Sequence, residues 1–235
     1  MSKVVAMISG GMESALLMYR LRDSDVIALI FNCWQDGEEF KNREINLAMK
    51  QAKRYRKKYE IIDVSDINGK MIDEDSPESY VPGFQLIMTS IALSYAESKG
   101  AEVLARGDTH CTIPGYRNNQ LYKEGRKIID DLREGLVLVE QLYERLYDNR
   151  VHLWFPFYGM DKADIVRDLL SNGIQDNSHC SCVESMDSWE VEDGINHCGN
   201  CFNCSTRREG YKLAKKEDKT KYREGKYNLE RYKEG

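Results

Sequence analysis

The first fourteen residues constrain the fold of this chain more than any other stretch. Lys3–Ile8 (KVVAMI) is a short apolar run with the length of a buried parallel strand. Residues 9–14 (SGGMES) follow at once, and Ala15 continues into an apolar helix. Two glycines allow a tight turn and a close approach of a ligand to backbone N–H groups, and the helix start adds its positive dipole end. This order predicts a phosphate or pyrophosphate site, in which the carboxylate of Glu13 could hold Mg²⁺.

The hexapeptide resembles the SGGxDS loop of the PP-loop ATP pyrophosphatases, which transfer AMP to a carboxylate or carbonyl oxygen and release pyrophosphate. It is not a Walker loop, because no G-x-x-x-x-G-K-[ST] sequence occurs. The superfamily has Asp where this chain has Glu13, so the charge is kept and the carboxylate lies one methylene further out. A glycine pair after a strand can also be a simple tight turn, and that interpretation stays open. The predicted nucleotide-binding residues of the loop are Ser9, Gly10, Gly11, Met12, Glu13 and Ser14.

Length and composition fit a soluble protein of one domain, or one domain with a small appendage. The 235 residues are 41% hydrophobic, which suffices for a core, and 31% charged, with a net charge of −5. No stretch approaches the ~18–20 consecutive apolar residues of a membrane span, and no signal-peptide layout precedes the first strand. We therefore expect a cytoplasmic protein without a membrane partner. The acidic balance makes nucleic acid an unexpected partner, because nucleic-acid binding needs a basic surface.

Strand and helix patterns alternate through the first half of the chain. Asp25–Phe31, Tyr59–Val64 and Ala101–Ala105 read as further strands, with helices at 44–58 and 84–98 between them. This alternation predicts an α/β fold, a Rossmann-like doubly wound parallel sheet with helices on both faces. Ligands bind such sheets at the carboxyl ends of the strands. The first loop should therefore share a crevice with residues 32–37 and 106–110, where Gly107 is a further predicted nucleotide contact.

The second half is less regular. Residues 113–125 read as a loop, 126–147 as a packing helix, 152–157 as an apolar connection and 161–170 as another helix. The charged stretch from Tyr211 onward is typical of a solvated helix or tail. We divide the chain into an ATP-binding α/β domain over residues 1–175 and a zinc-binding, helical C-terminal segment over residues 176–235, both within one compact unit.

Five of the seven cysteines lie between residues 180 and 204. An odd number and tight clustering favour metal binding over a disulfide framework. Cys198, Cys201 and Cys204 follow one another at three-residue steps, and a fourth thiol lies upstream at Cys180 or Cys182. Four thiolates close a tetrahedral structural zinc site. An iron–sulfur cluster is the main alternative, and His197 could replace a missing thiol.

A PP-loop at the start and C-G-x-C-x-x-C near the end together resemble the 7-cyano-7-deazaguanine synthase (QueC-like) family of the queuosine precursor pathway. The resemblance implies ATP-dependent adenylation of 7-carboxy-7-deazaguanine and capture of the acyl adenylate by ammonia as an amide. A second ATP-dependent step would dehydrate the amide to the nitrile. It also implies ATP and Mg²⁺ as cofactors, one structural Zn²⁺ per chain and a homodimer.

The resemblance assigns roles to residues far apart in the chain. Ser181-Cys182 resembles the upstream Ser-Cys of the family, which makes Cys182 the fourth metal ligand beside Cys198, Cys201 and Cys204. Lys162, followed by Asp164-Ile165, resembles the late K-x-E-I helix and would neutralise developing charge, so the implied catalytic residues are Ser9, Glu13 and Lys162. Phe31 and Gln35 fit the second strand and its following turn, as nucleotide contacts.

The differences from the family pattern gather where the substrate should bind. Phe84-Gln85 stands where the family has Arg-Asn, and Gly115-Tyr116-Arg117-Asn118 stands where it has Gly-Tyr-Pro-Asp. An Arg can clamp a carboxylate bidentately and Phe cannot. Adenylation therefore looks retained, while recognition of the acid or the amine looks altered. The predicted substrate-binding residues are Phe84, Gln85, Tyr116 and Arg117.

Three other functions compete with that of a 7-cyano-7-deazaguanine synthase. A diverged relative could join deazaguanine to another amine such as a protein N-terminus, as relatives associated with bacterial antiviral defence are thought to do. A tRNA-modifying PP-loop enzyme, such as a thiolase, would need a basic surface or an added RNA-binding domain. A zinc-bearing interaction module without activity is the third, and Glu13 in place of Asp is the feature that supports it.

Overall fold

A five-stranded parallel sheet forms the body of the structure, a computed structural model that describes residues 2–33, 39–67, 83–109, 120–147, 151–174, 178–182, 196–199 and 201–222. The strand order is β3-β2-β1-β4-β5, and each neighbouring pair is parallel. The predicted α/β class with a doubly wound parallel sheet is confirmed. The strands are β1 (Val4–Met7), β2 (Val26–Asn32), β3 (Lys58–Asp63), β4 (Val103–Arg106) and β5 (His152–Trp154).

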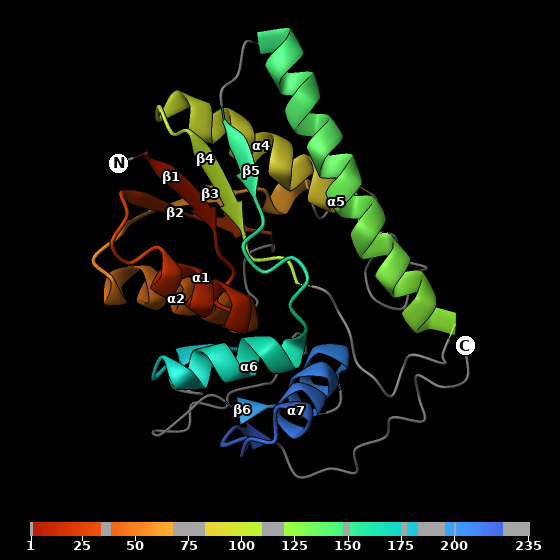
Figure 1. Cartoon of the computed structure of the whole chain (residues 1–235). Coiled ribbons are helices and arrows are strands. Elements are labelled where there is room, and N and C mark those ends of the chain that lie inside the picture. The colour runs from red at the N-terminus through yellow and green to blue at the C-terminus, as the bar shows by residue number, and fades with distance from the viewer. Residues whose placement is uncertain are drawn as a thin grey trace.

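Helices cover both faces of this sheet (Figure 1). The helices α1, α2, α6 and α7 pack around one apolar cluster, and α4 and α5 pack around a second cluster on the opposite face. Their bounds are α1 (Met12–Arg20), α2 (Glu39–Arg54), α4 (Phe84–Ser98), α5 (Gln120–Tyr147), α6 (Lys162–Ser171) and α7 (Phe202–Ala214), and two short strands, β6 (Asn196–His197) and β7 (Lys221–Tyr222), pair in parallel.

The central strands are apolar on both faces because both faces are covered. In β1, Val4 and Ala6 belong to the cluster of α1 and α2, whereas Val5 belongs to the cluster of α4. Successive side chains of a strand point to opposite faces, so a strand between two helical layers needs apolar residues at every position. This is why KVVAMI shows no polar alternation.

Several assignments made from the sequence were wrong. The helix predicted at 44–58 is α2, which ends at Arg54, and Lys58 already belongs to β3. The apolar connection at 152–157 begins with a strand, since β5 pairs with β4 through His152 opposite Val103 and becomes the edge of the sheet. The helix α5 begins at Gln120, although residues 113–125 were predicted as a loop. A helix gains one backbone hydrogen bond for each residue added, so an amphipathic helix can extend through polar residues such as those before 126.

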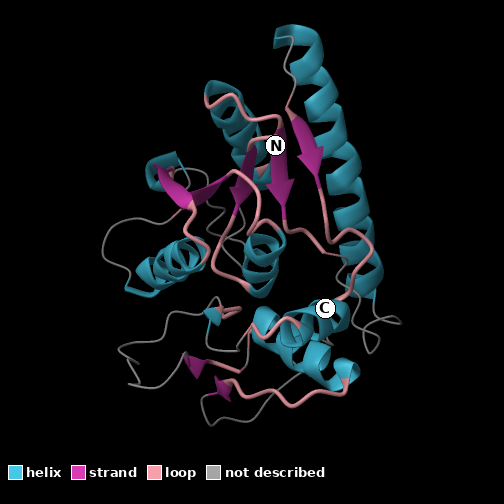
Figure 2. Cartoon of the chain, turned by 60° about the vertical axis from the view of Figure 1, so that its left-hand side comes forward, coloured by secondary structure: helices cyan, strands magenta, loops and turns pink. Residues whose placement is uncertain are grey.

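The strand order places a topological switch point beside β1, where a ligand crevice is expected in a parallel sheet. The chain leaves β1 toward β2 on one side, and β4 lies on the other side of β1, so the connections run in opposite directions from this point. The strands point their carboxyl ends toward the part of the molecule that carries α6, α7 and the small sheet (Figure 2). The loops after β1 and β4 therefore meet beneath the sheet. None of the described helices is long and apolar enough to cross a membrane.

Candidate active site and metal centre

The loop after β1 is held in a shape that only glycine allows. Gly10 has a φ of +81°, and a Cβ atom there would lie 2.7 Å from the Glu44 carbonyl oxygen. The loop therefore packs directly on the backbone of α2. The Ser9 N–H donates to the Ser14 hydroxyl oxygen at 2.9 Å, which closes the loop over the first turn of α1.

The first turn of α1 is a ready anion site. Gly11 is the N-cap and brings no side chain to the orphan N–H groups, so these groups can bind a ligand. Glu13 lies in this same turn. A carboxylate beside phosphate-binding N–H groups favours a bridging cation over direct contact with an anion.

Lys162 meets Glu13 across the crevice. It is the first residue of α6, and its Nζ donates to Glu13 Oε1. The aliphatic part of Lys162 lies on Gly210 of α7, where a Cβ atom would come within 2.6 Å of Lys162 Cγ. Both charged side chains are about one-fifth exposed, at 18% and 21%. Three elements thus bring a cation and an anion together at the phosphate-binding loop.

Gln51 ties the loop to α2 and to the cysteine-bearing segment. Its buried Nε2 donates to the carbonyl oxygens of Gly10, Gly11 and Ser178, at 3.0, 3.2 and 3.2 Å. The Cys180 N–H donates to the Gly10 carbonyl oxygen at 3.0 Å. The peptide groups of the loop are therefore fixed from behind, which leaves the N-terminal side of α1 to face the crevice.

A buried arginine organises the other wall of the crevice. Arg106, the last residue of β4, is 4% exposed and donates to the carboxylate of Asp108 at 2.7 and 3.0 Å. It also donates to Gln85 Oε1 at 2.8 Å and to the hydroxyl of Thr89. The next residue, Gly107, lies against Glu13, since a Cβ atom there would be 3.2 Å from Glu13 Cβ.

Burial raises the pKa values of two ionisable side chains near the loop. Burial raises the pKa of Glu44 to about 7. It also raises the pKa of the Cys33 thiol to about 12, with smaller contributions from the charges of Glu44 and Asp63. Glu44 is thus a carboxyl group that can exchange a proton near neutral pH at the back of the phosphate-binding loop.

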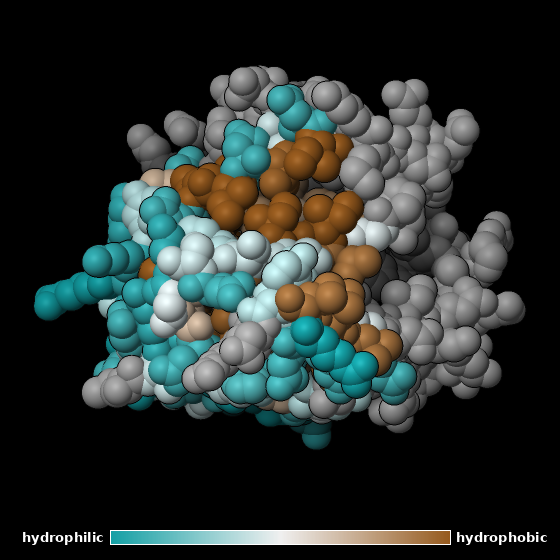
Figure 3. Space-filling model, turned by 90° about the horizontal axis from the view of Figure 1, so that it is seen from above, coloured by the Kyte–Doolittle hydropathy of each residue, from teal (hydrophilic) through white to brown (hydrophobic). Residues whose placement is uncertain are grey.

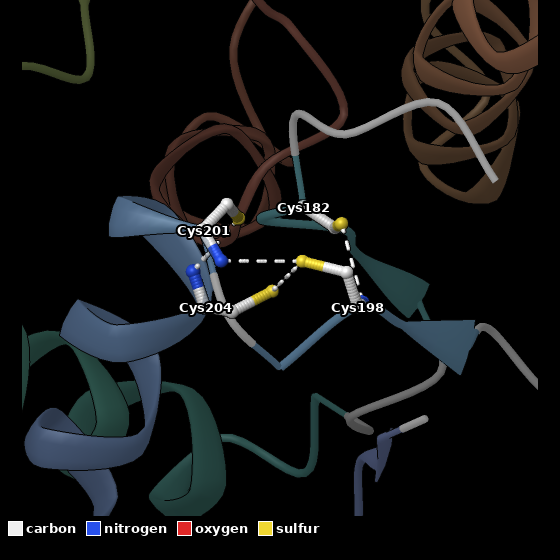
Figure 4. Close-up of side chains that lie close together, drawn as sticks. All are labelled: Cys182, Cys198, Cys201 and Cys204. Atoms are coloured by element: carbon white, nitrogen blue, oxygen red, sulfur yellow. Dashed lines mark hydrogen bonds between the residues drawn. The ribbon is translucent and has the colours of Figure 1, made fainter. Parts of the chain in front are cut away.

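Four buried cysteines form a second centre below the loop. Cys182, Cys198, Cys201 and Cys204 bring their sulfur atoms within 4.8 Å of one another, and the sulfurs face a common space (Figure 4). Three of these sulfurs accept backbone N–H groups, at 3.2 to 3.4 Å. Backbone N–H groups that donate to the sulfurs stabilise the negative charge of metal-bound thiolates. The donor set therefore fits a metal that prefers four sulfur ligands.

The surroundings of the thiols suit metal binding. A hydrogen bond with the Cys198 thiol lowers the pKa of Cys182, which favours the metal-binding thiolate. His197 Nδ1 lies 3.7 Å from the Cys204 sulfur, at second-shell distance. Burial and the nearby Arg207 charge lower the pKa of His179, so its neutral Nδ1 accepts a hydrogen bond from Arg207 at 2.8 Å.

Comparison with known proteins identifies the family. The family model described as "Queuosine biosynthesis protein QueC" matches residues 3–215. The chain belongs to the QueC family. The resemblance predicted from the PP-loop and the cysteine spacing is confirmed.

The alignments of this QueC-family chain with curated relatives cover nearly the whole of both sequences. The 7-cyano-7-deazaguanine synthase of Sulfurovum sp. is 28% identical, over 94% of this chain and 98% of that relative. The enzyme of the same name from Methanoculleus marisnigri is 29% identical, over 94% and 99%. A solved structure, the U34-tRNA thiolase NcsA from Methanococcus maripaludis with its [4Fe-4S] cluster, aligns with a TM-score of 0.53 at 16% identity. The alignment covers 92% of this chain and 73% of that chain, and shows that the two share a fold.

The structure brings most of the predicted site residues of this QueC-family protein together. The loop residues, Lys162 and Gly107 meet at the crevice, and Phe31 is a half-buried residue near the end of β2. Gln85 is bonded to Arg106, while its neighbour Phe84 is half-buried at the start of α4. The four metal residues converge without Cys180. Gln35, Tyr116 and Arg117 lie outside the described residues.

Sequence reasoning missed Gln51 and Thr89, and included Arg106 and Asp108 only within the range 106–110 without a role of their own. Gln51 offered one signal, because it is a polar residue within the apolar face that includes Ala48 and Ala52. Arg106 offered a similar one, as a charge at the end of a predicted buried strand. Neither signal indicates which residues the side chain contacts.

Proposed function

We propose that this QueC-family protein adenylates 7-carboxy-7-deazaguanine with ATP and amidates it with ammonia on the way to 7-cyano-7-deazaguanine. The observation that carries the proposal is the meeting of Glu13 and Lys162 at the N-terminus of α1, beside the glycine loop. The curated relatives named 7-cyano-7-deazaguanine synthase support the same chemistry. The protein would then be an ATP-dependent carbon–nitrogen ligase.

Each site residue would have its own role in the adenylation step. The N–H groups of the loop and α1, with the hydroxyls of Ser9 and Ser14, would hold the phosphates. Glu13 would hold Mg²⁺, which supplies positive charge between phosphate oxygens when bound. A carboxylate oxygen of the substrate attacks the α-phosphorus, and pyrophosphate leaves as Lys162 compensates its charge. Ammonia then attacks the acyl carbon and AMP leaves, which forms the amide.

Zinc is the metal that we propose for the cysteine centre, held by Cys182, Cys198, Cys201 and Cys204 as one structural ion per chain. A closed set of four thiolates leaves no position for a substrate, so the ion would take no part in the reaction. We propose a cytoplasmic location, because reduced thiols persist there. Metal analysis with an absorption spectrum separates zinc, which is colourless, from an iron–sulfur cluster.

The test of the reaction is a mass-resolved turnover assay with ATP, Mg²⁺ and 7-carboxy-7-deazaguanine, with and without ammonium. We expect pyrophosphate from ATP and the acid alone, and nitrile only when ammonium is present. No consumption of ATP with this acid would overturn the proposal.

A second candidate differs only in the amine acceptor. Phe84-Gln85 in place of Arg-Asn favours an altered acceptor, such as a protein N-terminus. In the same assay this candidate gives ATP cleavage and acyl adenylate, without nitrile, even when ammonium is added. Addition of peptides with a free N-terminal amine would then yield a peptide heavier by the deazaguanine acyl group.

We also propose that the protein is a homodimer that pairs through α5. Leu138, Leu142 and Leu146 are 63%, 52% and 61% exposed and follow one another at four-residue steps on α5. Apolar residues gather on the face of the molecule that carries α4 and α5 (Figure 3). The stripe is symmetric about Leu142, so an antiparallel second copy would place Leu138 of one copy opposite Leu146 of the other. Such self-complementarity is what a two-fold interface requires.

A further inference from the structure

Arg106 fixes a set of polar side chains at the carboxyl end of β4. Its Nε and Nη2 donate to the two carboxylate oxygens of Asp108, at 2.7 and 3.0 Å. Its Nη2 also donates to Gln85 Oε1 at 2.8 Å, and its Nη1 donates to the Thr89 hydroxyl. The Thr89 hydroxyl donates in turn to the backbone carbonyl of Gln85 at 2.6 Å. Because Arg106 is 4% exposed, these bonds are shielded from competing water.

The guanidinium decides which atoms Gln85 and Asp108 present to a ligand. Arginine has only donors, so the amide oxygen of Gln85 faces Arg106 and the Nε2–H₂ group points away. Each Asp108 oxygen accepts one bond from Arg106 and keeps lone-pair capacity for another donor. Gln85 Oε1 and Asp108 Oδ1 bond the same nitrogen, so an amide donor and a carboxylate acceptor lie side by side.

A ligand can reach this pair from the crevice. The Asp108 side chain is 34% exposed, and Gln85 is exposed in the first turn of α4. Gly107, which precedes Asp108, lies against Glu13 of the phosphate-binding loop. A molecule bound by Gln85 and Asp108 would therefore lie beside the proposed position of the ATP phosphates.

We propose that Gln85 and Asp108 recognise the six-membered-ring edge of a guanine-type base, with Arg106 as the positioning residue. This edge presents an acceptor, O6, followed by two donors, N1–H and N2–H₂. Gln85 Nε2 donates to O6, and the Asp108 carboxylate accepts from N1–H and N2–H₂. A base with an amino group at position 6 would meet the amide with a second donor, and a base without the 2-amino group would lose a bond to the carboxylate. The inference rests on the proposed deazaguanine substrate and assigns the residues that select it.

The test is calorimetric binding to the full chain, run beside ATP turnover. The probes are 7-carboxy-7-deazaguanine, its analogue without the 2-amino group, and its analogue with a 6-amino group in place of O6. We expect the wild-type protein to bind the guanine form about 10- to 100-fold more tightly than either analogue.

Three variants separate recognition from a merely structural role. Gln85→Glu replaces the amide donor with an acceptor and should weaken binding of the guanine form, so that its advantage over the 6-amino analogue shrinks; the analogue still meets Asp108 with an N1 that carries no hydrogen. Asp108→Asn keeps an oxygen for Arg106 and should lose most of the preference for the 2-amino group. Arg106→Lys keeps the charge without the fork that holds both partners, and should weaken both preferences. Glu97→Gln, an exposed position at the other end of α4, is the matched control.

The outcomes distinguish this inference from the proposed reaction. Equal binding of the three probes to the wild-type protein would overturn the inference. Unchanged preferences in Gln85→Glu and Asp108→Asn, with unaltered melting temperatures, would also overturn it. Selective binding of the guanine form without ATP cleavage would leave the inference intact and overturn the proposed reaction instead.

Discussion

At the scale of single residues, the ion pair between Glu13 and Lys162 is the part of the site closest to the proposed chemistry. Each partner comes from the first turn of a helix, and the two helices are about 150 residues apart in the chain. In the proposed reaction, Glu13 would gain a cation as a second partner when ATP binds, and Lys162 would then be free to turn toward the phosphate oxygens. The ion pair would thus keep the positive charge of Lys162 close to the pyrophosphate that leaves.

Lys162→Met tests this role. Met keeps the length and the apolar stem that packs on Gly210 while it removes the charge. We expect acid-dependent release of pyrophosphate to fall about 10²-fold, because one electrostatic contact to the transition state is lost. Lys216→Met, at an exposed position after α7, should retain full activity. Equal activity of both variants would exclude Lys162 from the reaction.

Glu44 gives a prediction about pH. Its folded-state pKa of about 7 lies above its ordinary value of 4.5, because burial opposes the charged form. As pH rises from 4.5 to 7, the unfolded state has lost this proton while the folded state still holds it, so the free energy of unfolding falls through that window and then stays level. Glu44→Gln should therefore be more stable than the wild type by about 2–3 kcal/mol at pH 8, and equal to it near pH 4.

Urea unfolding at pH 4, 6 and 8 measures this difference. Glu60→Gln, at an exposed position of β3, is the control and should show no such dependence. A constant difference between Glu44→Gln and the wild type at all three pH values would contradict a buried, titrating carboxyl group.

The roles of residues in short sequence motifs could be predicted. The roles of residues whose partners are distant in the sequence could not. The glycine loop and the three cysteines at regular steps are short-range patterns with one dominant chemical explanation each. Apart from Asp108, which is two positions from Arg106, the partners of Arg106 and Gln51 lie 17 to 127 positions away. Their partners depend on how the helices pack, which a single sequence does not encode locally.

At the scale of elements, the hydrogen bonds of Gln51 join the segment that carries Cys180 and Cys182 to the glycine loop. One amide group of α2 holds two carbonyls of the loop and one of residues 178–182. The Cys180 N–H bond to Gly10 adds a second link. Movement of the metal segment would therefore be transmitted to the N–H groups that bind phosphate.

Gln51→Met removes the bridge and leaves the volume nearly unchanged. We expect the free energy of unfolding to fall by about 1–3 kcal/mol, because buried carbonyls lose their donor. The KM for ATP should rise about 5- to 10-fold, while kcat changes less. Lys50→Met, on the exposed side of α2, is the control. Lower stability with an unchanged KM for ATP would mean that the bridge only supports folding.

Cysteine variants test the metal ligands. Cys201→Ser and Cys182→Ser should each lower the metal content and the melting temperature, because a buried four-sulfur set loses one donor. Cys180→Ser is the matched control, since this thiol is buried beside the centre and does not belong to the converging set. Metal loss from Cys180→Ser at the level of Cys182→Ser would contradict the assignment. A chain that folds equally well without metal would contradict the structural role.

The elements that sequence patterns missed have a common cause. The strand β5 has only three residues, and its place in the sheet depends on pairing with β4. Its apolar residues alone suit a buried connection as well as a strand. In contrast, the strands β1 and β2 and the helix α4 carry long apolar patterns that tertiary contacts reinforce, so their positions could be predicted closely.

At the scale of the whole molecule, α5 is unlike the other helices. One side of α5 packs on the apolar cluster of the sheet through Val139 and Tyr143, while Leu138, Leu142 and Leu146 are exposed. A water-exposed leucine stripe on a 28-residue helix is unfavourable in a monomer, because its burial would be favourable by roughly 25 cal/mol for each Å². Association of two copies through this stripe would remove that cost.

Leu142→Glu tests the dimer at its expected axis. In a two-fold pair the two new carboxylates would lie close together in an apolar contact, so repulsion and desolvation act at once. We expect light scattering to show a dimer for the wild type and a monomer for this variant at micromolar concentration. Ile67→Glu places the same charge on another exposed apolar residue, 48% exposed, and should leave the dimer intact. A monomeric wild type would overturn the proposed dimer, and a dimeric Leu142→Glu would place the interface away from α5, since one buried charge pair at the axis is enough to break so small a contact.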